Sequence, residues 1–299
     1  MSKLGLAKRM RPSDEILGIS NSEKVFIEDI DPELMFEYDG NPFNPYNDED
    51  LEDLAESILK NGVLHPIIIR PLNDRYQILS GRNRFRAVRL AGLNSIPSII
   101  KDVDDDTAAL IVAETNLRQR EKVLHSERAR AYKMQMDALK RQGARNDLLQ
   151  NLQKVDITAE IAKRAKDSKR NVHYHIRLLS LNKAFLIMVD NEKMPFHVGV
   201  ELSYLPMEMQ EQICIIFFRY HIKITLELAR TIKQAHNDGK LNKEYLEQLL
   251  IPQENRPKPI SAVKVPYKRI QTFFTKNESK KDIEEIIVEA LRFYREHHN

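Results

Sequence analysis

The alternation of apolar and polar residues over residues 24–117 predicts short strands and helices that follow one another in turn. "KVFIEDI", "HPIIIRP", "RYQILSG" and "SIPSII" have the length and apolar content of strands. "NDEDLEDLAESILKNG" places Leu51 and Ile58 on one face of a helix that Gly62 ends, and "RNRFRAVRLAG" predicts a second helix ended by Gly92. "DVDDDTAALIVAETN" predicts a third, with aspartates at its positive start. This interleaving predicts a small α/β domain.

After about Leu117 the strand signals end and only helical patterns follow. "LHSERARAYKMQMDALKRQG" predicts a helix with Ser126 as its N-cap and Gly143 at its end. "DITAEIAKRAKDSKRNVHYHIRLLSLN" predicts two short helices joined at about residues 166–168. Further helices are predicted at "AFLIMVDN", "HVGVELSYL", "MEMQEQICIIFFRY" and "TLELARTIKQAH". We therefore expect an all-α domain after the α/β domain.

The stretch "IPQENRPKPISAVKVP" predicts a linker, because it holds four of the chain's 13 prolines. It leads to a last amphipathic helix, whose apolar stripe is formed by Ile283, Ile286, Ile287, Ala290, Leu291 and Tyr294. This stripe predicts either a dimer contact or packing within a small C-terminal domain. The chain is thus expected to have four parts: a flexible basic tail over residues 1–22, an α/β domain over 23–122, an all-α domain over 123–250, and a linker with a C-terminal helical segment over 251–299.

The composition is that of a soluble globular protein, with 42% apolar and 30% charged residues among 299. No apolar run is long enough to span a bilayer, and "MSKLGLAKRMRPSDE" lacks the apolar middle of a signal peptide. We therefore expect a cytoplasmic protein that has no membrane partner. Cys214 is the single cysteine and lies in the apolar run "ICIIFF", so it predicts buried packing rather than a disulfide or a metal site.

The charge is unevenly distributed along the chain. Residues 1–117 carry 13 Lys and Arg against 21 Asp and Glu, a net charge of −8, whereas residues 118–183 carry 17 against 7, a net charge of +10. A basic segment of this density is typical of a nucleic-acid binder, because neutralised phosphates release their condensed counterions. A solvated helical face is the alternative, and charge alone leaves the two readings about even.

Gly81 lies between a predicted strand and a predicted helix whose first turns contain Arg82, Arg84 and Arg86. A residue without Cβ lets backbone amides approach an anion there, and the helix start and its arginines add attraction. This geometry suits a di- or triphosphate. The alternative is a basic helix face that pairs with the acidic helix at residues 48–56. "GRNR" is neither a Walker loop nor a dinucleotide fingerprint.

The segment "AETNLRQRE" places Glu114 and Asn116 beside Arg118 and Arg120. A carboxylate and an amide next to arginines are what holding a metal-bound phosphate and orienting a water require. The ordinary polarity of a helix end explains these residues equally well.

The two helices predicted over residues 156–181 have the pattern of a helix-turn-helix, with Thr158 as N-cap. Inward positions are expected at Ile161, Ala162, Val172, Ile176 and Leu179. The residues expected to reach bases and phosphates are Ser168, Lys169, Arg170, Asn171, His173, Tyr174 and Arg177, with Arg128, Arg130 and Lys133 on the DNA backbone. An ordinary αα-hairpin is the alternative. His173 and His175 have no acidic or cysteine neighbours in the sequence and predict no metal site.

Four segments, in this order, resemble the ParB family of plasmid and chromosome partition proteins over roughly residues 24–215. They are "NPFNPYNDEDLEDLAESILKNGVLHPIIIR", "SGRNRFRA", "ETNLRQREKVLHSERARAY" and "DITAEIAKRAKDSKRNVHYHIRLLSL". They are similar to the family's opening block, its Gly-Glu-Arg-Arg-x-Arg-Ala nucleotide motif, its Glu-Asn-Leu-Gln-Arg block and its helix-turn-helix. The resemblance implies a ParB- or RepB-like protein of a plasmid or mobile element.

The resemblance implies an α/β ParB-like nucleotide domain, similar in fold to sulfiredoxin, then an all-α helix-turn-helix DNA-binding domain and a small C-terminal helical segment. It implies that the first domain binds CTP with Mg²⁺ and that the second binds a palindromic centromere-like site in double-stranded DNA. It further implies a nucleoid-associated homodimer that closes as a sliding clamp and that slow CTP hydrolysis reopens. A Walker-type ParA ATPase is the implied partner of the basic tail, where Lys3, Lys8, Arg9 and Arg11 lie.

Carried over by position, the implied nucleotide-binding residues are Gly81, Arg82, Asn83, Arg84, Arg86 and Arg120. Arg82 and Asn83 replace the motif's usual glutamate and first arginine. Glu114 and Asn116 are the implied catalytic pair and Mg²⁺ ligands. Lys166 replaces the usual turn glycine, so it must adopt a left-handed conformation or the turn must shift.

Two other functions stay open, and one is set aside. A nucleotide-independent DNA-binding regulator of replication or transcription fits if "GRNR" no longer holds nucleotide. A nuclease or phosphotransferase that uses Glu114 as base or metal ligand is less favoured, because no dense acidic cluster is present. Sulfiredoxin carries a reactive cysteine just after the motif glycine, where this chain has Arg82, so a redox enzyme is set aside.

Overall fold

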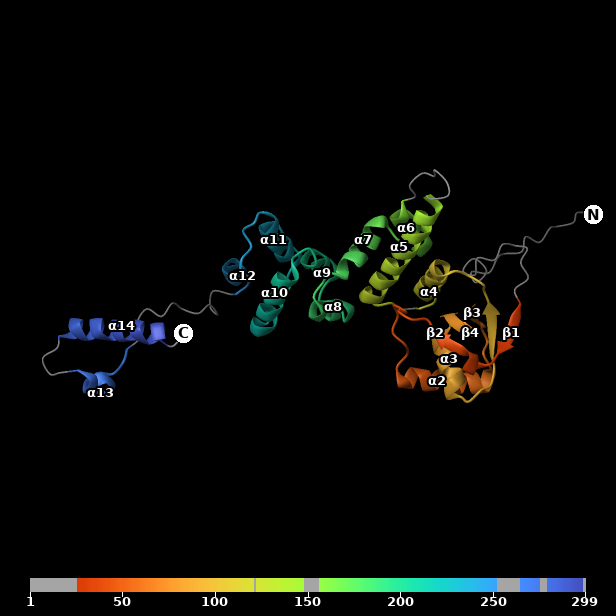
Figure 1. Ribbon diagram of the computed structural model, residues 1–299, viewed down its shortest axis with the longest axis horizontal. Helices are drawn as coiled ribbons and strands as arrows, with labels where there is room; N and C mark the ends of the chain where they lie inside the picture. Colours follow the sequence, from red (N-terminus) through yellow and green to blue (C-terminus); the bar gives the residue numbers. More distant parts are fainter. Residues whose placement is uncertain (1–25, 121, 148–155, 252–263, 275–278, 298–299) are drawn as a thin grey trace, which may run out of the picture. The chain divides into compact units, whose positions relative to one another are not determined.

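The computed structural model describes residues 26–120, 122–147, 156–251, 264–274 and 279–297 (Figure 1). Its contacts divide the chain into two compact units, Met1–Ile251 and Pro252–Asn299. The predicted basic tail, with Lys3, Lys8, Arg9 and Arg11, lies outside the described residues, as does most of the predicted linker.

A mixed five-stranded sheet, in the order β1-β5-β3-β4-β2, forms the start of the first unit. The strands are β1 (Ile27–Ile30), β2 (Met35–Glu37), β3 (Ile67–Leu72), β4 (Arg75–Ser80) and β5 (Ile96–Ile100). β1 and β5 pair antiparallel, as do β3 and β4, while β3 and β5 pair parallel and so do β2 and β4. Four of the five strands match the apolar runs in the sequence, whereas β2 was not predicted.

Helices cover both faces of this sheet, α2 (Asp48–Asn61) and α3 (Arg82–Leu90) on one side and α4 (Asp105–Gln119) on the other (Figure 1). Successive strand residues point to opposite faces, so Ile67 and Ile69 join the core under α2 and α3, while Ile68 joins the core under α4. The side chains of Asn47 and Asp104 cap the starts of α2 and α4. The predicted α/β fold class is confirmed.

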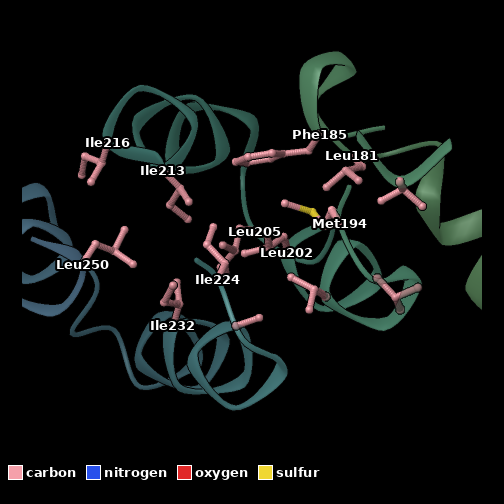
Figure 2. Close-up of a cluster of buried hydrophobic side chains, with 14 of the residues drawn as sticks. Leu181, Phe185, Met194, Leu202, Leu205, Ile213, Ile216, Ile224, Ile232 and Leu250 are labelled. Carbon is pink, nitrogen blue, oxygen red and sulfur yellow. The ribbon is translucent and has the colours of Figure 1, made fainter. Parts of the chain in front are cut away.

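The rest of the first unit is helical among its described residues. The helices are α5 (His125–Asp147), α6 (Ile157–Ala165), α7 (Lys169–Leu178), α8 (Lys183–Asp190), α9 (Phe196–Leu202), α10 (Met207–Tyr220), α11 (Leu226–Asn237) and α12 (Lys243–Leu250). Figure 2 shows the core that α8 to α12 share, with Phe185, Leu202, Ile213, Ile232 and Leu250 turned inward. Cys214 packs against this core but is only half-buried, and α12 was not predicted from the sequence.

Both predicted ends of α5 are wrong. Ser126 is not its N-cap but lies inside the first turn, and Leu124 occupies the cap position. The backbone N–H of Leu124 donates to Oε2 of Glu127 at 3.1 Å, so a carboxylate at the third helical residue satisfies the helix start. At the other end the helix runs through Gly143 to Asp147, because a single glycine inside a helix is tolerated.

Two positions in the helix-turn-helix also differ from the prediction. The N-cap of α6 is Asp156 rather than Thr158, and its carboxylate accepts from the N–H of Ala159 at 3.0 Å. On α7 the inward leucine is Leu178, which is fully buried, whereas Leu179 ends the helix and is exposed. A shift of one residue turns a side chain by about 100° around the helix, which is enough to reverse inside and outside.

The second unit holds a short helix α13 (Tyr267–Ile270), a 3₁₀ turn at Gln271–Phe273, and α14 (Lys280–His297). No residue of α14 is buried within the described part of this unit. In the described residues as a whole, no helix has the combined length and apolar character that a bilayer span requires.

Candidate nucleotide pocket and nucleic-acid interface

A pocket of about 260 Å³ lies at the start of α3. Its lining consists of Tyr46, Leu54, Gly81, Arg82, Asn83, Arg84, Asn116 and Arg120. The fold therefore brings the predicted cradle after β4 together with two residues from the end of α4. Arg86 and Glu114, which were also predicted, do not line it.

Gly81 makes the sharp turn from β4 into α3 in the left-handed region, with φ of 95°. A Cβ on this residue would lie 2.4 Å from Cγ2 of Ile67, so only glycine fits. No side chain in the described part of the molecule caps the start of α3. The first N–H groups of the helix, together with its dipole, therefore face the pocket and favour an anion.

Arg84 is the pocket arginine that has no carboxylate partner among the described residues. Its Nη1 donates to the carbonyl oxygens of His65 and Pro66, the latter at 2.8 Å. Burial lowers the pKa of Arg84, which remains a cation at any physiological pH. No carboxylate among the described residues compensates this charge, so Arg84 favours an anion in the pocket.

The other arginines of α3 pair with carboxylates on β2 and on the turn before it. Arg86 donates twice to Glu37, at 2.6 and 2.9 Å, and Nε of Arg82 lies 4.0 Å from the same carboxylate. Arg89 pairs with Glu33 at 3.4 Å. The alternative prediction was that these arginines pair with the acidic helix at residues 48–56. They do form ion pairs, but with Glu37 and Glu33 instead of that helix. Strand β2, which the sequence analysis missed, brings Glu37 alongside α3.

Residues 42–46 form a loop that the pocket side chains hold by its backbone. Arg82 donates to the carbonyl of Phe43 at 2.7 Å, and Arg120 donates to the carbonyl of Asn44 at 2.7 Å. Oδ1 of Asn83 accepts from the N–H of Tyr46 at 3.3 Å. Burial is the largest cause that lowers the pKa of Arg82, and the charge of Glu37 opposes it.

Glu114 and Asn116, the predicted catalytic pair, point to different surroundings. Asn116 lines the pocket, and its Nδ2 donates to the carbonyl of Val112 at 2.8 Å. Oε1 of Glu114 instead accepts from Nη1 of Arg164 on α6 at 2.8 Å. Among the described residues, no group of three or more His, Cys, Asp and Glu side chains is placed to hold a metal ion.

The turn between α6 and α7 is a compact three-residue connection. Lys166 adopts the left-handed conformation with φ of 53°, which is the first of the two outcomes predicted for a lysine at this turn. Asp167 accepts from the hydroxyl of Tyr132 on α5 at 2.9 Å, and Oγ of Ser168 caps α7 by accepting from the N–H of Asn171. The turn is thus fastened to α5.

The first turns of α7 present polar side chains to solvent. Lys169, Arg170, Asn171 and His173 are exposed. The guanidinium of Arg170 lies 5.2 Å from the centre of the Tyr174 ring, and its Nε donates to the Tyr174 hydroxyl at 2.7 Å. The two side chains are therefore held against each other. This is the surface that a helix-turn-helix presents to a DNA groove.

Arg177 is different, because its Nη2 donates to the carbonyl of Ser203 and its guanidinium lies 4.5 Å from the Tyr204 ring. These contacts hold it against α9 rather than in the exposed row on α7. Arg130 is likewise engaged, since it donates to the carbonyl of Pro42 at 3.1 Å. Lys133 is exposed and pairs with Asp137 one turn along α5, while Arg128 is half-buried.

A family model described as the ParB N-terminal domain matches residues 18–117. A probable chromosome-partitioning protein ParB from Helicobacter pylori is 31% identical over 206 residues, which cover 67% of this chain and 66% of that protein. The stage 0 sporulation protein J from Bacillus subtilis is 35% identical over 163 residues, which cover 53% of this chain and 49% of that protein. The chain belongs to the ParB family. Its match spans about half to two thirds of the length of these two relatives.

Two solved structures of the C-terminally truncated chromosome-partitioning protein ParB from Caulobacter crescentus are also similar. The complex with the centromeric parS site is 23% identical, with a TM-score of 0.44, and covers 74% of this chain and 97% of that one. The complex with CTP-γ-S is 26% identical, with a TM-score of 0.30, and covers 63% of this chain and 99% of that one.

Sequence reasoning missed a cluster of aromatic and histidine side chains that packs behind α7, in which His175 is buried. Nδ1 of His175 lies 2.9 Å from the carbonyl of Asn171, and its Nε2 lies 3.3 Å from Nδ1 of His125. Both rings pack against Phe196, with centroids 4.8 Å apart in a stacked arrangement for His125 and 4.7 Å apart in a tilted one for His175. Burial is the largest cause that lowers the pKa of His175 to about 4, and it lowers that of His125 as well. His125 and His175 are 50 positions apart, so the spacing of residues within one helix could not indicate that they meet.

Proposed function

We propose that this chain is a DNA-binding partition protein regulated by CTP, which it binds at the start of α3. The observation that carries the proposal is the pocket itself. The pocket has three features that favour an anion. Gly81 leaves no space for another residue, the start of α3 is uncapped, and Arg84 has no carboxylate partner among the described residues. A triphosphate is the ligand that matches such a set, and membership of the ParB family supports cytosine as its base.

The lining residues fit the phosphates of a nucleotide. The α3 amides and Arg84 would bind them, and Arg82 and Arg120 would add positive charge. Asn83 adds no charge, but its Oδ1 accepts from the N–H of Tyr46 and its Nδ2 can donate to a phosphate. Tyr46 and Leu54 would cover the less polar part of the ligand.

The same lining fits magnesium only in part. Mg²⁺ takes oxygen ligands and is usually held by carboxylates together with substrate phosphates. The residues that line the pocket in the described structure include the amide of Asn116 but no carboxylate, and Glu114 is paired with Arg164. Mg²⁺ at Asn116 and slow CTP hydrolysis by Glu114 therefore stay predictions.

The DNA-binding half of the proposal rests on the exposed residues of α7 and on family membership. Double-stranded DNA with a palindromic centromere-like site is the proposed partner, and a homodimer would match its symmetry. The apolar stripe of α14 is a candidate for the dimer contact. A ParA-type ATPase is the proposed partner of the N-terminal tail, and the protein would be found with the nucleoid.

Titration of the full chain with CTP in the presence of Mg²⁺ tests this proposal by calorimetry. We expect saturable binding that GTP and ATP do not reproduce, and no heat at millimolar CTP would contradict it. Footprinting on a closed DNA circle then separates the clamp from a nucleotide-independent regulator, because only the clamp spreads from its site when CTP is added. Cleavage or phosphate transfer that is lost in Glu114→Gln would instead indicate the nuclease or phosphotransferase.

A further inference from the structure

Glu127 is a buried carboxylate in the first turn of α5 and is not one of the residues that line the pocket. Only 2% of this residue is exposed. A buried carboxylate is unfavourable unless charges or hydrogen bonds compensate it. Its partners therefore indicate what it does.

Three elements meet at this carboxylate. Oε1 accepts from the N–H of Asn44 at 2.7 Å, and Oε2 accepts from the N–H of Leu124 at 3.1 Å. Nη1 of Arg120 lies 3.6 Å from Oε1. Glu127 thus joins the loop at residues 42–46, the end of α4 and the start of α5.

Glu127 and Arg120 hold both backbone polar groups of Asn44. Glu127 accepts from its N–H, and Arg120 donates to its carbonyl at 2.7 Å while lying 5.2 Å from the Phe43 ring. Asn44 is two residues from Tyr46, which lines the pocket and donates its N–H to Asn83. The pair therefore places a pocket arginine and a pocket wall at the same time.

We propose that Glu127 is a positioning residue of the nucleotide pocket, an inference that rests on the proposed function. It fixes Arg120 and the loop at residues 42–46 in the arrangement that the phosphates need. It also means that the pocket is completed by a residue of α5, beyond the segment matched by the N-terminal family model.

An opposing effect has to be weighed, because Glu127 also attracts Arg120 away from a phosphate. The separation of 3.6 Å leaves no direct hydrogen bond between the two side chains, so Arg120 keeps its donors for the Asn44 carbonyl and for a phosphate. The bond from Asn44 at 2.7 Å is short and involves a charged acceptor, which makes it one of the stronger kinds. Loss of positioning therefore outweighs release of the arginine, and removing Glu127 weakens nucleotide binding.

The test is calorimetric titration of the full chain with CTP and Mg²⁺. We expect Glu127→Ala to weaken CTP binding about tenfold, the range for losing a hydrogen bond to a charged group. Glu127→Gln should weaken it less, because its amide oxygen can still accept from Asn44. Asp106→Asn is the matched control. Asp106 is a buried carboxylate that accepts from Arg141 between α4 and α5, away from the pocket, so its loss should leave CTP binding unchanged.

A double-mutant cycle separates positioning from general loosening of the fold. In the Arg120→Gln background, Glu127→Gln should have little further effect, whereas in the Arg84→Gln background its effect should be the same as in the wild type. If Glu127→Ala does not fold, as judged by thermal unfolding, Glu127→Gln decides alone. Unchanged or tighter CTP binding in these variants, or equal effects in both backgrounds, would overturn the inference. Absence of CTP binding by the wild-type chain would instead remove the proposed function and this inference with it.

Discussion

Arg86 and Glu37 form a two-point ion pair, with Nε of Arg86 2.6 Å from Oε1 and Nη2 2.9 Å from Oε2. Glu37 ends β2, and Arg86 lies two residues after Arg84 on α3. Two residues rotate a side chain by about 200° around a helix, so Arg84 faces the pocket while Arg86 faces β2. Two arginines of one motif therefore point in different directions, one toward the pocket and one toward the sheet.

The first prediction concerns this division. Arg84→Ala should weaken CTP binding by at least about tenfold, because a charge-assisted contact to phosphate is lost. Arg86→Ala should change CTP binding by less than about threefold but lower the free energy of unfolding by about 1 kcal/mol, since the pair is partly exposed. Calorimetry with CTP and urea unfolding measure the two effects. Equal losses of affinity in both variants would contradict the assignment.

The second prediction concerns Gly81. Gly81→Ala should destabilise the fold by roughly 1–3 kcal/mol, because the added Cβ overpacks against Ile67 and the backbone is left-handed. CTP binding should fall with it, since any relief moves the start of α3. Denaturant unfolding and calorimetry check both effects.

Gly92 provides the matched control for Gly81. It also has a positive φ, of 67°, but a Cβ there would have nothing within 4 Å. Gly92→Ala should therefore lower stability by only about 1 kcal/mol, from backbone strain alone, and leave CTP binding unchanged. A loss of CTP binding in Gly92→Ala as large as in Gly81→Ala would show that strain, rather than the close approach to Ile67, is responsible.

Much of the fold could be predicted because its signals are local. The apolar runs of β3 and β4, the period of α2 and the turn at residues 166–168 each lie within a short stretch of sequence. The same is true of the pocket's core, since Gly81, Arg82, Asn83 and Arg84 are consecutive. Strand β2 was not predicted, because its three residues are too few to show an alternation of apolar and polar positions.

The remaining part of the pocket depends on contacts between residues far apart in the chain. Arg82 meets the carbonyl of Phe43 across 39 positions, and Glu127 meets Asn44 across 83. A backbone carbonyl or N–H carries no side-chain signal in the sequence, so these partners could not be chosen beforehand. The pairing of Glu114 with Arg164, 50 positions away, was hidden for the same reason.

The third prediction separates two arginines of α7. Arg170→Ala should weaken binding to the specific DNA site and reduce the salt slope by about 1, because an exposed cation that can contact phosphate is lost. Arg177→Ala should mainly lower the midpoint of thermal unfolding, since it removes the contacts with Ser203 and Tyr204. Fluorescence anisotropy over a range of salt concentrations measures the first effect, and calorimetric unfolding measures the second. A larger loss of salt slope in Arg177→Ala than in Arg170→Ala would reverse the assignment.

The fourth prediction concerns the neutral pair His125 and His175. The carbonyl of Asn171 can only accept, so Nδ1 of His175 carries the proton and its Nε2 can accept from His125. Their folded pKa values lie below the ordinary 6.5, about 4 for His175, so below pH 6.5 the unfolded chain binds protons that the folded chain does not. Stability is therefore complete above about pH 6.5 and falls as the pH drops toward 4, by about 1 kcal/mol per pH unit for His175, and His125 adds a loss in the same direction.

Urea unfolding between pH 4.5 and 8 measures this dependence. Asp190 and Asp167 raise the two pKa values slightly and Arg128 lowers them, but burial exceeds all three effects. His175→Gln should be less stable at pH 8 and show a flatter pH profile, whereas His173→Gln, at an exposed position, should keep the wild-type profile. A wild-type profile that is flat over this range would contradict the neutral pair.

The fifth prediction concerns self-association through α14. Leu291 on this helix is 61% exposed within its own unit, and a stripe of such residues is unfavourable in water unless a partner covers it. If that partner is a second copy, Leu291→Asp should raise the dimer dissociation constant of the full chain at least about tenfold, because a charge enters an apolar contact. Glu289→Gln, two residues away and on the opposite face of the helix, is the control and should leave dimerisation unchanged. Sedimentation equilibrium measures both, and equal dissociation constants for the wild type and Leu291→Asp would place the dimer contact elsewhere.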